Sequence, residues 1–102
     1  MEAAPVFAAL GDETRLRIVS RLSERGPMPI VELTEGTGIT RQAVTKHLSA
    51  LQDAGLLRSA RVGRQRIWEL EPKGLRQVQR RLETISRQWD DAIDRLRAFV
   101  ED

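Results

Sequence analysis

Polar side chains that can donate hydrogen bonds recur at helical spacing within residues 40–53. Positions 42, 45, 46 and 49 follow an i, i+3, i+4, i+7 pattern, so in a helix they share one face. No residue of that face is acidic, and several of them can also accept a hydrogen bond. Such a helix fits the major groove of B-DNA, where glutamine and arginine bind adenine and guanine edges through paired hydrogen bonds. The candidate DNA-binding residues here are Thr40, Arg41, Gln42, Thr45, Lys46 and Ser49.

A second group of candidate contacts surrounds a predicted turn at Gly63-Arg64, between two short extended segments. Glycine in the first place of a two-residue loop is typical of a type II′ hairpin turn. A ribbon tipped with arginine can reach flanking phosphates or the negative potential of a narrow minor groove. The alternative is an edge hairpin whose charges only oppose aggregation. The candidate DNA-binding residues of this ribbon are Arg61, Arg64 and Arg66.

The positive charge of the chain is concentrated in one segment. The whole chain has a net charge of only +2, whereas residues 41–67 contain six basic residues and one acid, Asp53, which gives that segment a charge of +5. Concentrated basic charge is typical of proteins that bind polyanions, and the alternative is an ordinary solvated basic surface.

The residue inventory excludes several kinds of site. The 102 residues include no cysteine and one histidine, His47, so disulfides, thiolate catalysis and a multi-histidine metal site are excluded within one chain. Gly36-Thr37-Gly38 lacks the spacing of a phosphate-binding loop, and we expect no enzyme activity, no cofactor and no metal. The apolar runs are too short to cross a bilayer, and the N-terminus lacks the basic start of a signal peptide. We therefore expect a cytoplasmic protein with no membrane partner.

Hydrophobic periodicity predicts that mostly helices position these candidates. A short helix is expected over residues 5–10. A second begins after the capping residue Asp12 and ends at Gly26-Pro27, and a third covers residues 29–34. The inward residues expected in the second helix are Leu16, Val19 and Leu22, with Ile18 beside them.

The fourth helix is expected to begin after Thr40, which caps it, and to end at Ala54-Gly55. Its apolar stripe lies opposite the face of hydrogen-bond donors. Two extended segments follow, over residues 56–62 and 65–70, and Pro72 can open a final helix. The predicted stripe of the fourth helix is Ala43, Val44, Leu48 and Leu51.

The final helix carries an apolar seam at heptad spacing. Its apolar residues step alternately by three and four over about three and a half repeats, which is typical of a helix that pairs with another helix. We expect a homodimer formed through this seam with help from the first helix. Asp90, Asp91 and Asp94 are interpreted as the solvated face. The predicted dimer-interface residues are Val6, Phe7, Leu10, Leu82, Ile85, Trp89, Ile93, Leu96 and Phe99.

The order of these elements is that of a winged helix-turn-helix. We predict a mainly α fold with a small β-hairpin wing and five helices. Residues 1–102 are expected to form a single DNA-binding domain, in which residues 72–100 are the long C-terminal dimerisation helix.

Several stretches, taken together, resemble the ArsR/SmtB-type bacterial transcriptional regulators. Residues 7–18 resemble the opening segment of that family, residues 38–48 its recognition helix, and residues 51–57 with Gly63-Arg64 the end of that helix and the wing. The resemblance implies a homodimeric winged-helix repressor that binds double-stranded DNA. The DNA-contact positions of the family fall on Arg41, Gln42, Thr45 and Lys46.

The chain departs from the metal-sensing members of that family. Those members carry paired cysteines at the start of the third helix, where this chain has residues 28–33 without cysteine, or aspartate and histidine in the last helix, where this chain has no histidine. The sequence therefore resembles the cysteine-free, non-metal-sensing branch. The resemblance identifies no small-molecule effector.

We therefore expect a sequence-specific, double-stranded-DNA-binding transcriptional regulator, most simply a homodimeric repressor of an inverted-repeat operator. The alternative is a winged-helix protein-interaction module without DNA binding, in which the heptad seam recruits a different helix. The two hypotheses differ in whether the protein shows salt-dependent binding to DNA.

Overall fold

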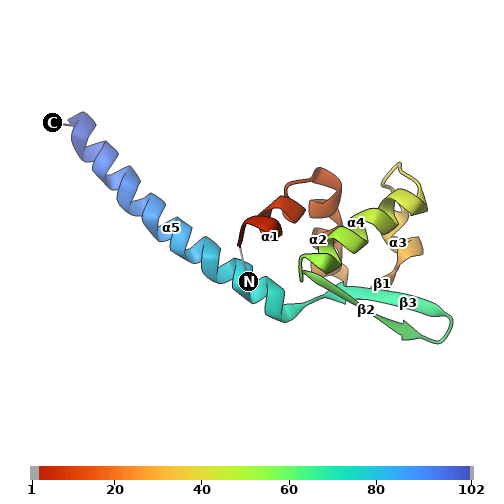
Figure 1. Ribbon diagram of the computed structural model, residues 1–102. Coiled ribbons are helices and arrows are strands. Elements are labelled where there is room, and N and C mark those ends of the chain that lie inside the picture. Colours follow the sequence, from red (N-terminus) through yellow and green to blue (C-terminus); the bar gives the residue numbers. More distant parts are fainter. Residues whose placement is uncertain (1–2, 102) are drawn as a thin grey trace.

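A computed structural model describes residues 3–101, in which a helical body carries a hairpin at one side and a long helix at the other (Figure 1). This range contains five helices and three strands, which confirms the predicted mainly α winged helix-turn-helix fold. The elements are α1 (Ala3–Leu10), α2 (Glu13–Arg25), β1 (Met28–Pro29), α3 (Ile30–Thr34), α4 (Arg41–Asp53), β2 (Leu57–Val62), β3 (Gln65–Leu70) and α5 (Pro72–Glu101).

Side-chain caps begin α2 and α4 at the residues that the sequence indicates. Asp12 Oδ2 accepts a hydrogen bond of 3.0 Å from the backbone N–H of Arg15, and Thr40 Oγ1 accepts one of 3.1 Å from the backbone N–H of Ala43. Each bond satisfies an N–H group that the first turn of a helix leaves unpaired. The predicted starts of both helices are confirmed.

The three strands form one antiparallel sheet in the order β1-β3-β2. Gly63 has a φ of +64° whereas Arg64 does not have a positive φ, which agrees with the predicted type II′ turn between β2 and β3. Strand β1, in which Met28 lies opposite Trp68 of β3, is not predicted from the sequence. Two residues are too few to show a period of two, so the sequence predicts Pro29 in the third helix, and that prediction is wrong because the helix begins at Ile30.

The core lies where α2, α3 and α4 meet the base of the hairpin. Leu33, Leu48 and Leu51 are fully buried in it, and Ile18 and Leu22 of α2 are 2% exposed. The prediction that Leu16 faces inward is wrong, because Leu16 is 44% exposed. Residues two apart lie about 200° apart around a helix, so Leu16 cannot share the face of Ile18.

A close contact between backbones fixes the start of α5. Gly74 is the buried residue of this helix, and a Cβ atom built on it would lie 1.9 Å from the carbonyl oxygen of Gly55. The backbone N–H of Glu71 also donates a hydrogen bond to the carbonyl of Leu56, at 2.9 Å. The end of α4 and the start of α5 are therefore in direct backbone contact.

Beyond its first turns, α5 extends away from the body (Figure 1). Leu75 and Val78 pack against the core, whereas Trp89 is 67% exposed and Phe99 is 82% exposed. The molecule measures 65 × 28 × 22 Å as a result. Although α5 is long, it is rich in charged residues, and no helix within the described range is apolar enough over a sufficient length to span a bilayer.

Candidate nucleic-acid interface

One side of α4 is buried in the core, and the opposite side is exposed to solvent. Val44, Leu48 and Leu51 are 0% exposed, which confirms these three residues of the predicted stripe, and Ala43 is half-buried. All of the candidate contact residues on α4 are exposed, and so is its capping residue. These residues are Thr40, Arg41, Gln42, Thr45, Lys46 and Ser49.

Two threonine hydroxyls of this face are already engaged with the backbone. Thr40 Oγ1 caps α4, and Thr45 Oγ1 donates to the carbonyl of Arg41 at 2.9 Å. Within residues 3–101, the side chains of Arg41, Gln42 and Lys46 have no hydrogen-bond or ion-pair partner, so their donors are available to an incoming molecule. The acid-free face therefore presents two cations and one amide.

The hairpin places two arginines directly opposite each other. Arg61 of β2 pairs in register with Arg66 of β3, on the sheet face that also carries buried Trp68. Like charges directly opposite each other in a sheet destabilise it. Arg66 Nη1 donates to Ser59 Oγ at 2.9 Å, which orders the side chain but leaves its charge uncompensated. An anion beside this pair would relieve the repulsion.

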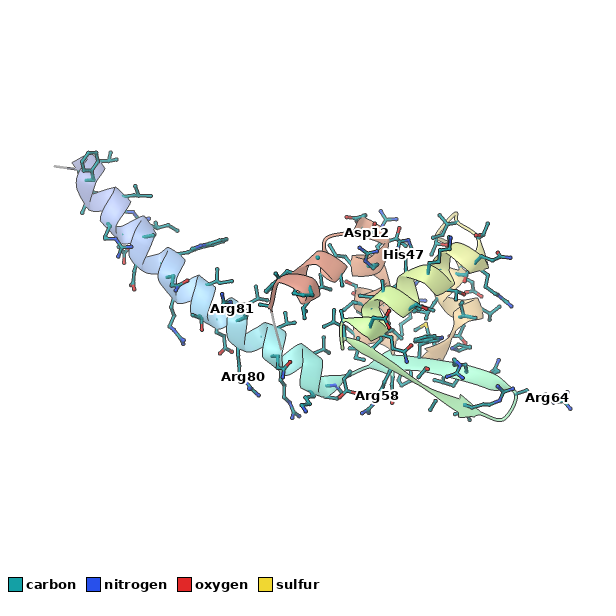
Figure 2. The ribbon with its side chains drawn as sticks, viewed as in Figure 1. Asp12, His47, Arg58, Arg64, Arg80 and Arg81 are labelled. Carbon is teal, nitrogen blue, oxygen red and sulfur yellow. The ribbon has the colours of Figure 1, made fainter. Side chains whose placement is uncertain are left out.

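The other cations of the hairpin differ in how far they are neutralised. Arg58, near its base, forms ion pairs with Glu69 at 2.7 Å and Glu71 at 3.2 Å, and the hydrogen bond that Arg58 donates to Glu69 raises the pKa of Arg58. Arg64 lies at the tip, far from α5 (Figure 2). The positive charge available at the wing therefore comes from Arg61, Arg64 and Arg66, the three residues singled out by sequence.

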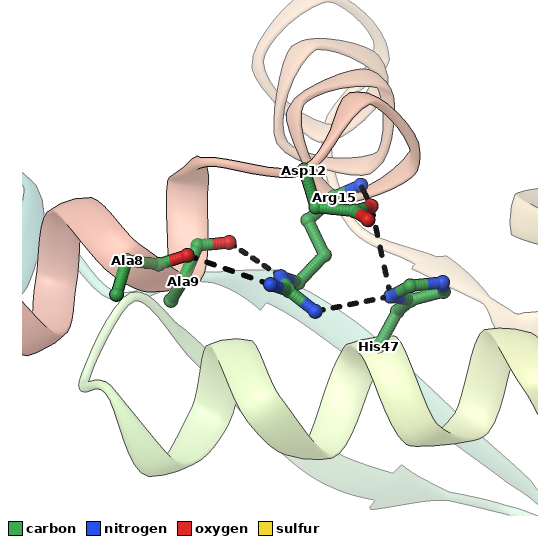
Figure 3. Close-up of polar contacts among 5 residues, drawn as sticks. All are labelled: Ala8, Ala9, Asp12, Arg15 and His47. Atoms are coloured by element: carbon green, nitrogen blue, oxygen red, sulfur yellow. Dashed lines mark hydrogen bonds and ion pairs between the residues drawn. The ribbon is translucent and has the colours of Figure 1, made fainter.

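A polar cluster that the sequence did not predict lies between α4, the start of α2 and the end of α1. It is formed by Asp12, Arg15 and His47 (Figure 3). The Arg15 side chain donates to the backbone carbonyls of Ala9 and Ala8 at the end of α1, and its Nη1 lies 3.4 Å from His47 Nδ1. The same Nδ1 lies 3.8 Å from Asp12 Oδ2. Because α2 supplies Arg15 and α4 supplies His47, the contact becomes apparent only after folding.

The contact with Arg15 bears on the tautomer of His47. A guanidinium can only donate hydrogen bonds, so Arg15 Nη1 can donate to Nδ1 of His47 only in the tautomer that carries its proton on Nε2. The hydrogen bond from the backbone N–H of Arg15 lowers the pKa of the Asp12 carboxyl, and the positive charge of the Arg15 guanidinium adds to this effect. His47 therefore has a structural role here, and no group of three or more histidine, cysteine, aspartate or glutamate side chains in residues 3–101 could hold a metal ion.

The residues predicted to form a dimer interface fall into two groups. Leu82, Trp89 and Ile93 are exposed on α5, as are Leu96 and Phe99, and Ile85 is half-buried. The predicted interface residues of α1 already contact other parts of the same chain. Phe7 lines an open groove between α1 and α5, Leu10 packs against the core, and Val6 is only 2% exposed. Val6 is thus a core residue with little surface left for a second copy.

These features define a class of protein. A three-helix body with a free polar α4 face, followed by an arginine-bearing hairpin, is a winged helix-turn-helix. The profile of a helix-turn-helix domain family matches residues 10–60 of this chain, which include α2, α3 and α4.

Known relatives narrow the class to one family. The chain is 48% identical over 68 residues to the HTH-type transcriptional regulator YuzN of Bacillus subtilis, covering 61% of this chain and 74% of that protein. It is 39% identical over 69 residues to the regulator Rv2034 of Mycobacterium tuberculosis, covering 68% of this chain and 64% of that protein. The solved structure of an ArsR-like transcriptional regulator from Rhodococcus sp. RHA1 superposes with a TM-score of 0.72 at 38% identity, covering 91% of this chain and 87% of that one.

The chain therefore belongs to the ArsR family of transcriptional regulators, with a helix-turn-helix DNA-binding domain. Its relatives are regulators and not enzymes. The free face of α4 occupies the position of the recognition helix in this fold, and the β2–β3 hairpin is its wing.

Proposed function

We propose that this protein binds an inverted-repeat operator in double-stranded DNA as a homodimer and represses transcription there. The observation that carries the proposal is the acid-free outer face of α4. Its Arg41, Gln42 and Lys46 side chains are exposed and have no partner within the described chain. A surface helix that served only solubility would mix acids with these bases.

The side chains of α4 and the wing differ in chemistry, so some suit base edges and others suit phosphates. Arg41 and Gln42 carry planar groups suited to guanine and adenine edges in the major groove. Lys46 is a point charge suited to phosphate, and Arg64 extends from the wing tip toward the flanking backbone or minor groove. Phosphate contacts release counterions, so affinity must fall steeply as salt rises.

The exposed seam of α5 supports self-association. Residues 72–100 act in this proposal as the dimerisation helix, with Trp89, Leu96 and Phe99 covered by a second copy. Pairing two chains sets two α4 helices about 34–36 Å apart, which is one turn of DNA. A dimer bound to a promoter would block access of RNA polymerase to that DNA. The proposal assigns no effector ligand.

Selection of bound duplexes from a random pool, followed by titration at several salt concentrations, tests the proposal. We expect an inverted repeat with half-sites one helical turn apart. Inserting about half a turn of DNA between the half-sites should abolish tight binding, because the second α4 would then face away from its groove. A protein that binds no duplex at low ionic strength would instead be a protein-interaction module.

A further inference from the structure

Arg15 is an unusual residue to find on the inner side of α2. It lies three residues before buried Ile18, on the face that packs against α1 and α4, and it is half-buried. Its guanidinium reaches two elements at once, donating to the carbonyls of Ala8 and Ala9 at the end of α1 and to His47 Nδ1 on α4 (Figure 3).

The Arg15 side chain contacts carbonyl groups at the end of α1 and the ring of His47 on α4. The carbonyls in the last turn of α1 have no partner within that helix. Arg15 supplies one to Ala9, whereas the carbonyl of Ala8 also accepts a hydrogen bond from the backbone N–H of Gly11 at 3.1 Å. His47 follows Lys46 directly, and its side chain is 23% exposed, so the ring lies between the core side and the outer side of α4. Asp12 is the other charged group that faces the ring, and it caps the helix that carries Arg15.

We propose that Arg15 is a positioning residue for the recognition helix. Through His47 it fixes the rotation of α4 relative to α1, and α1 in turn contacts α5. The rotation of α4 decides where Gln42 and Lys46 point. A change in the packing of α1 on α5 would therefore reach the DNA-contact face through the Arg15–His47 contact as well as through the direct packing of α1 on α4. The inference rests on the proposed function.

The planar fork of arginine is needed for this role. Its separate N–H groups bind the α1 carbonyls and the imidazole in fixed directions, whereas a lysine ammonium keeps the charge but cannot span both sites. Arg15→Lys is therefore the discriminating variant. Arg17→Lys is its matched control, because Arg17 lies on the same helix with an exposed side chain paired only with Glu13.

The bridge can be tested without DNA, since His47 is the sole histidine and its ring nitrogens give an unambiguous NMR signal. In the neutral ring, we expect the proton on Nε2 and an Nδ1 resonance that moves in Arg15→Lys but not in Arg17→Lys. A proton on Nδ1, or an Nδ1 resonance unchanged by Arg15→Lys, would overturn the bridge.

Operator titrations test the positioning role. Arg15→Lys and His47→Leu should each weaken operator binding by about tenfold, which is the order of one charge-assisted hydrogen bond, and the double variant should be no worse than the weaker-binding single variant. His47→Gln keeps an acceptor and should restore binding. The salt dependence should not change, because Arg15 touches no phosphate. Additive losses, or a reduced salt dependence, would refute the role.

The outcomes separate this inference from the proposed function. A protein that shows the His47 signature but binds no duplex refutes DNA binding, and the positioning role falls with it. A protein that binds its operator normally when Arg15 is replaced refutes the positioning role alone.

Discussion

Gln42 and Lys46 lie one turn apart on α4, and both are exposed, yet they offer different chemistry to DNA. The amide of Gln42 can both donate and accept, so it can distinguish one base edge from another. The ammonium of Lys46 can only donate and carries a full charge, so it suits any phosphate. Selectivity and affinity are therefore separable at these two residues.

Replacing each residue by alanine should show this separation. Gln42→Ala is expected to relax base preference at one position of each half-site, at a cost of about 1–3 kcal/mol in discrimination. Lys46→Ala should weaken binding to all sequences alike and reduce the salt slope by about one per chain. Binding to a panel of single-base operator variants at several salt concentrations measures both effects. An unchanged base preference in Gln42→Ala would exclude base reading by that residue.

Asp12 gives the folded protein a defined response to acid. Its pKa is lowered in the folded state, chiefly by the hydrogen bond from the backbone N–H of Arg15. The ionised carboxylate therefore stabilises the fold at pH values above its ordinary pKa of 3.8, and that contribution disappears as the pH falls through the lower folded value.

Asp12→Asn isolates this contribution, because asparagine is also a good helix cap but carries no charge. The wild-type protein should be more stable than Asp12→Asn at pH 7, and the difference should be smaller at pH 3, which lies below the ordinary pKa of 3.8. Urea midpoints at the two pH values measure the change. A difference that stays constant with pH would show that the charge of Asp12 contributes nothing.

At the scale of elements, the angle at which α5 leaves the body is set by a glycine. Gly74 allows the first turn of α5 to lie against the loop after α4, where any side chain would meet backbone that cannot move aside. Backbone contact of this kind is more restrictive than contact with a flexible side chain. The direction of α5 therefore depends on the absence of a Cβ atom at Gly74.

Gly74→Ala should be destabilising even though alanine is the better helix former. The added Cβ would overlap the Gly55 carbonyl, and overpacking of this sort costs about 1–3 kcal/mol or more. Thermal unfolding measures the change, and Gln79→Ala at an exposed site of α5 is the control. A Gly74→Ala protein as stable as the wild type would show that α5 can pivot freely on the body.

At the scale of the whole molecule, a single chain is more extended than a compact domain of the same length. Its radius of gyration is 17.4 Å, whereas a compact chain of this length is expected near 13 Å. The excess comes from α5, whose outer half exposes large apolar residues that a solvated monomer would not keep in water. A second copy packed along the seam would bury them.

Trp89→Asp should prevent this association, because a charge in the middle of a helix–helix seam cannot be buried without a partner. We expect a light-scattering mass near that of one 11.6 kDa chain and a large loss of operator affinity. Arg87→Asp places the same charge on the opposite side of α5 and should remain a dimer. If Trp89→Asp has twice the mass of one chain, Trp89 lies outside the interface.

The amino-acid sequence determined the local features of this protein. The caps at Asp12 and Thr40, the buried stripe of α4 and the turn at Gly63-Arg64 all follow from short-range patterns, because helix and hairpin geometry repeats over a few residues. The polar face of α4 follows for the same reason, since it lies opposite that stripe.

Only the tertiary structure decided which distant residues meet. It placed Arg15 between α1 and His47, brought Gly74 against Gly55 and buried Val6 in the core. These contacts join residues far apart in the sequence or on separate elements, and no local period encodes the distance between them. The contacts that join α1, α2, α4 and α5 therefore became visible only once the chain had folded.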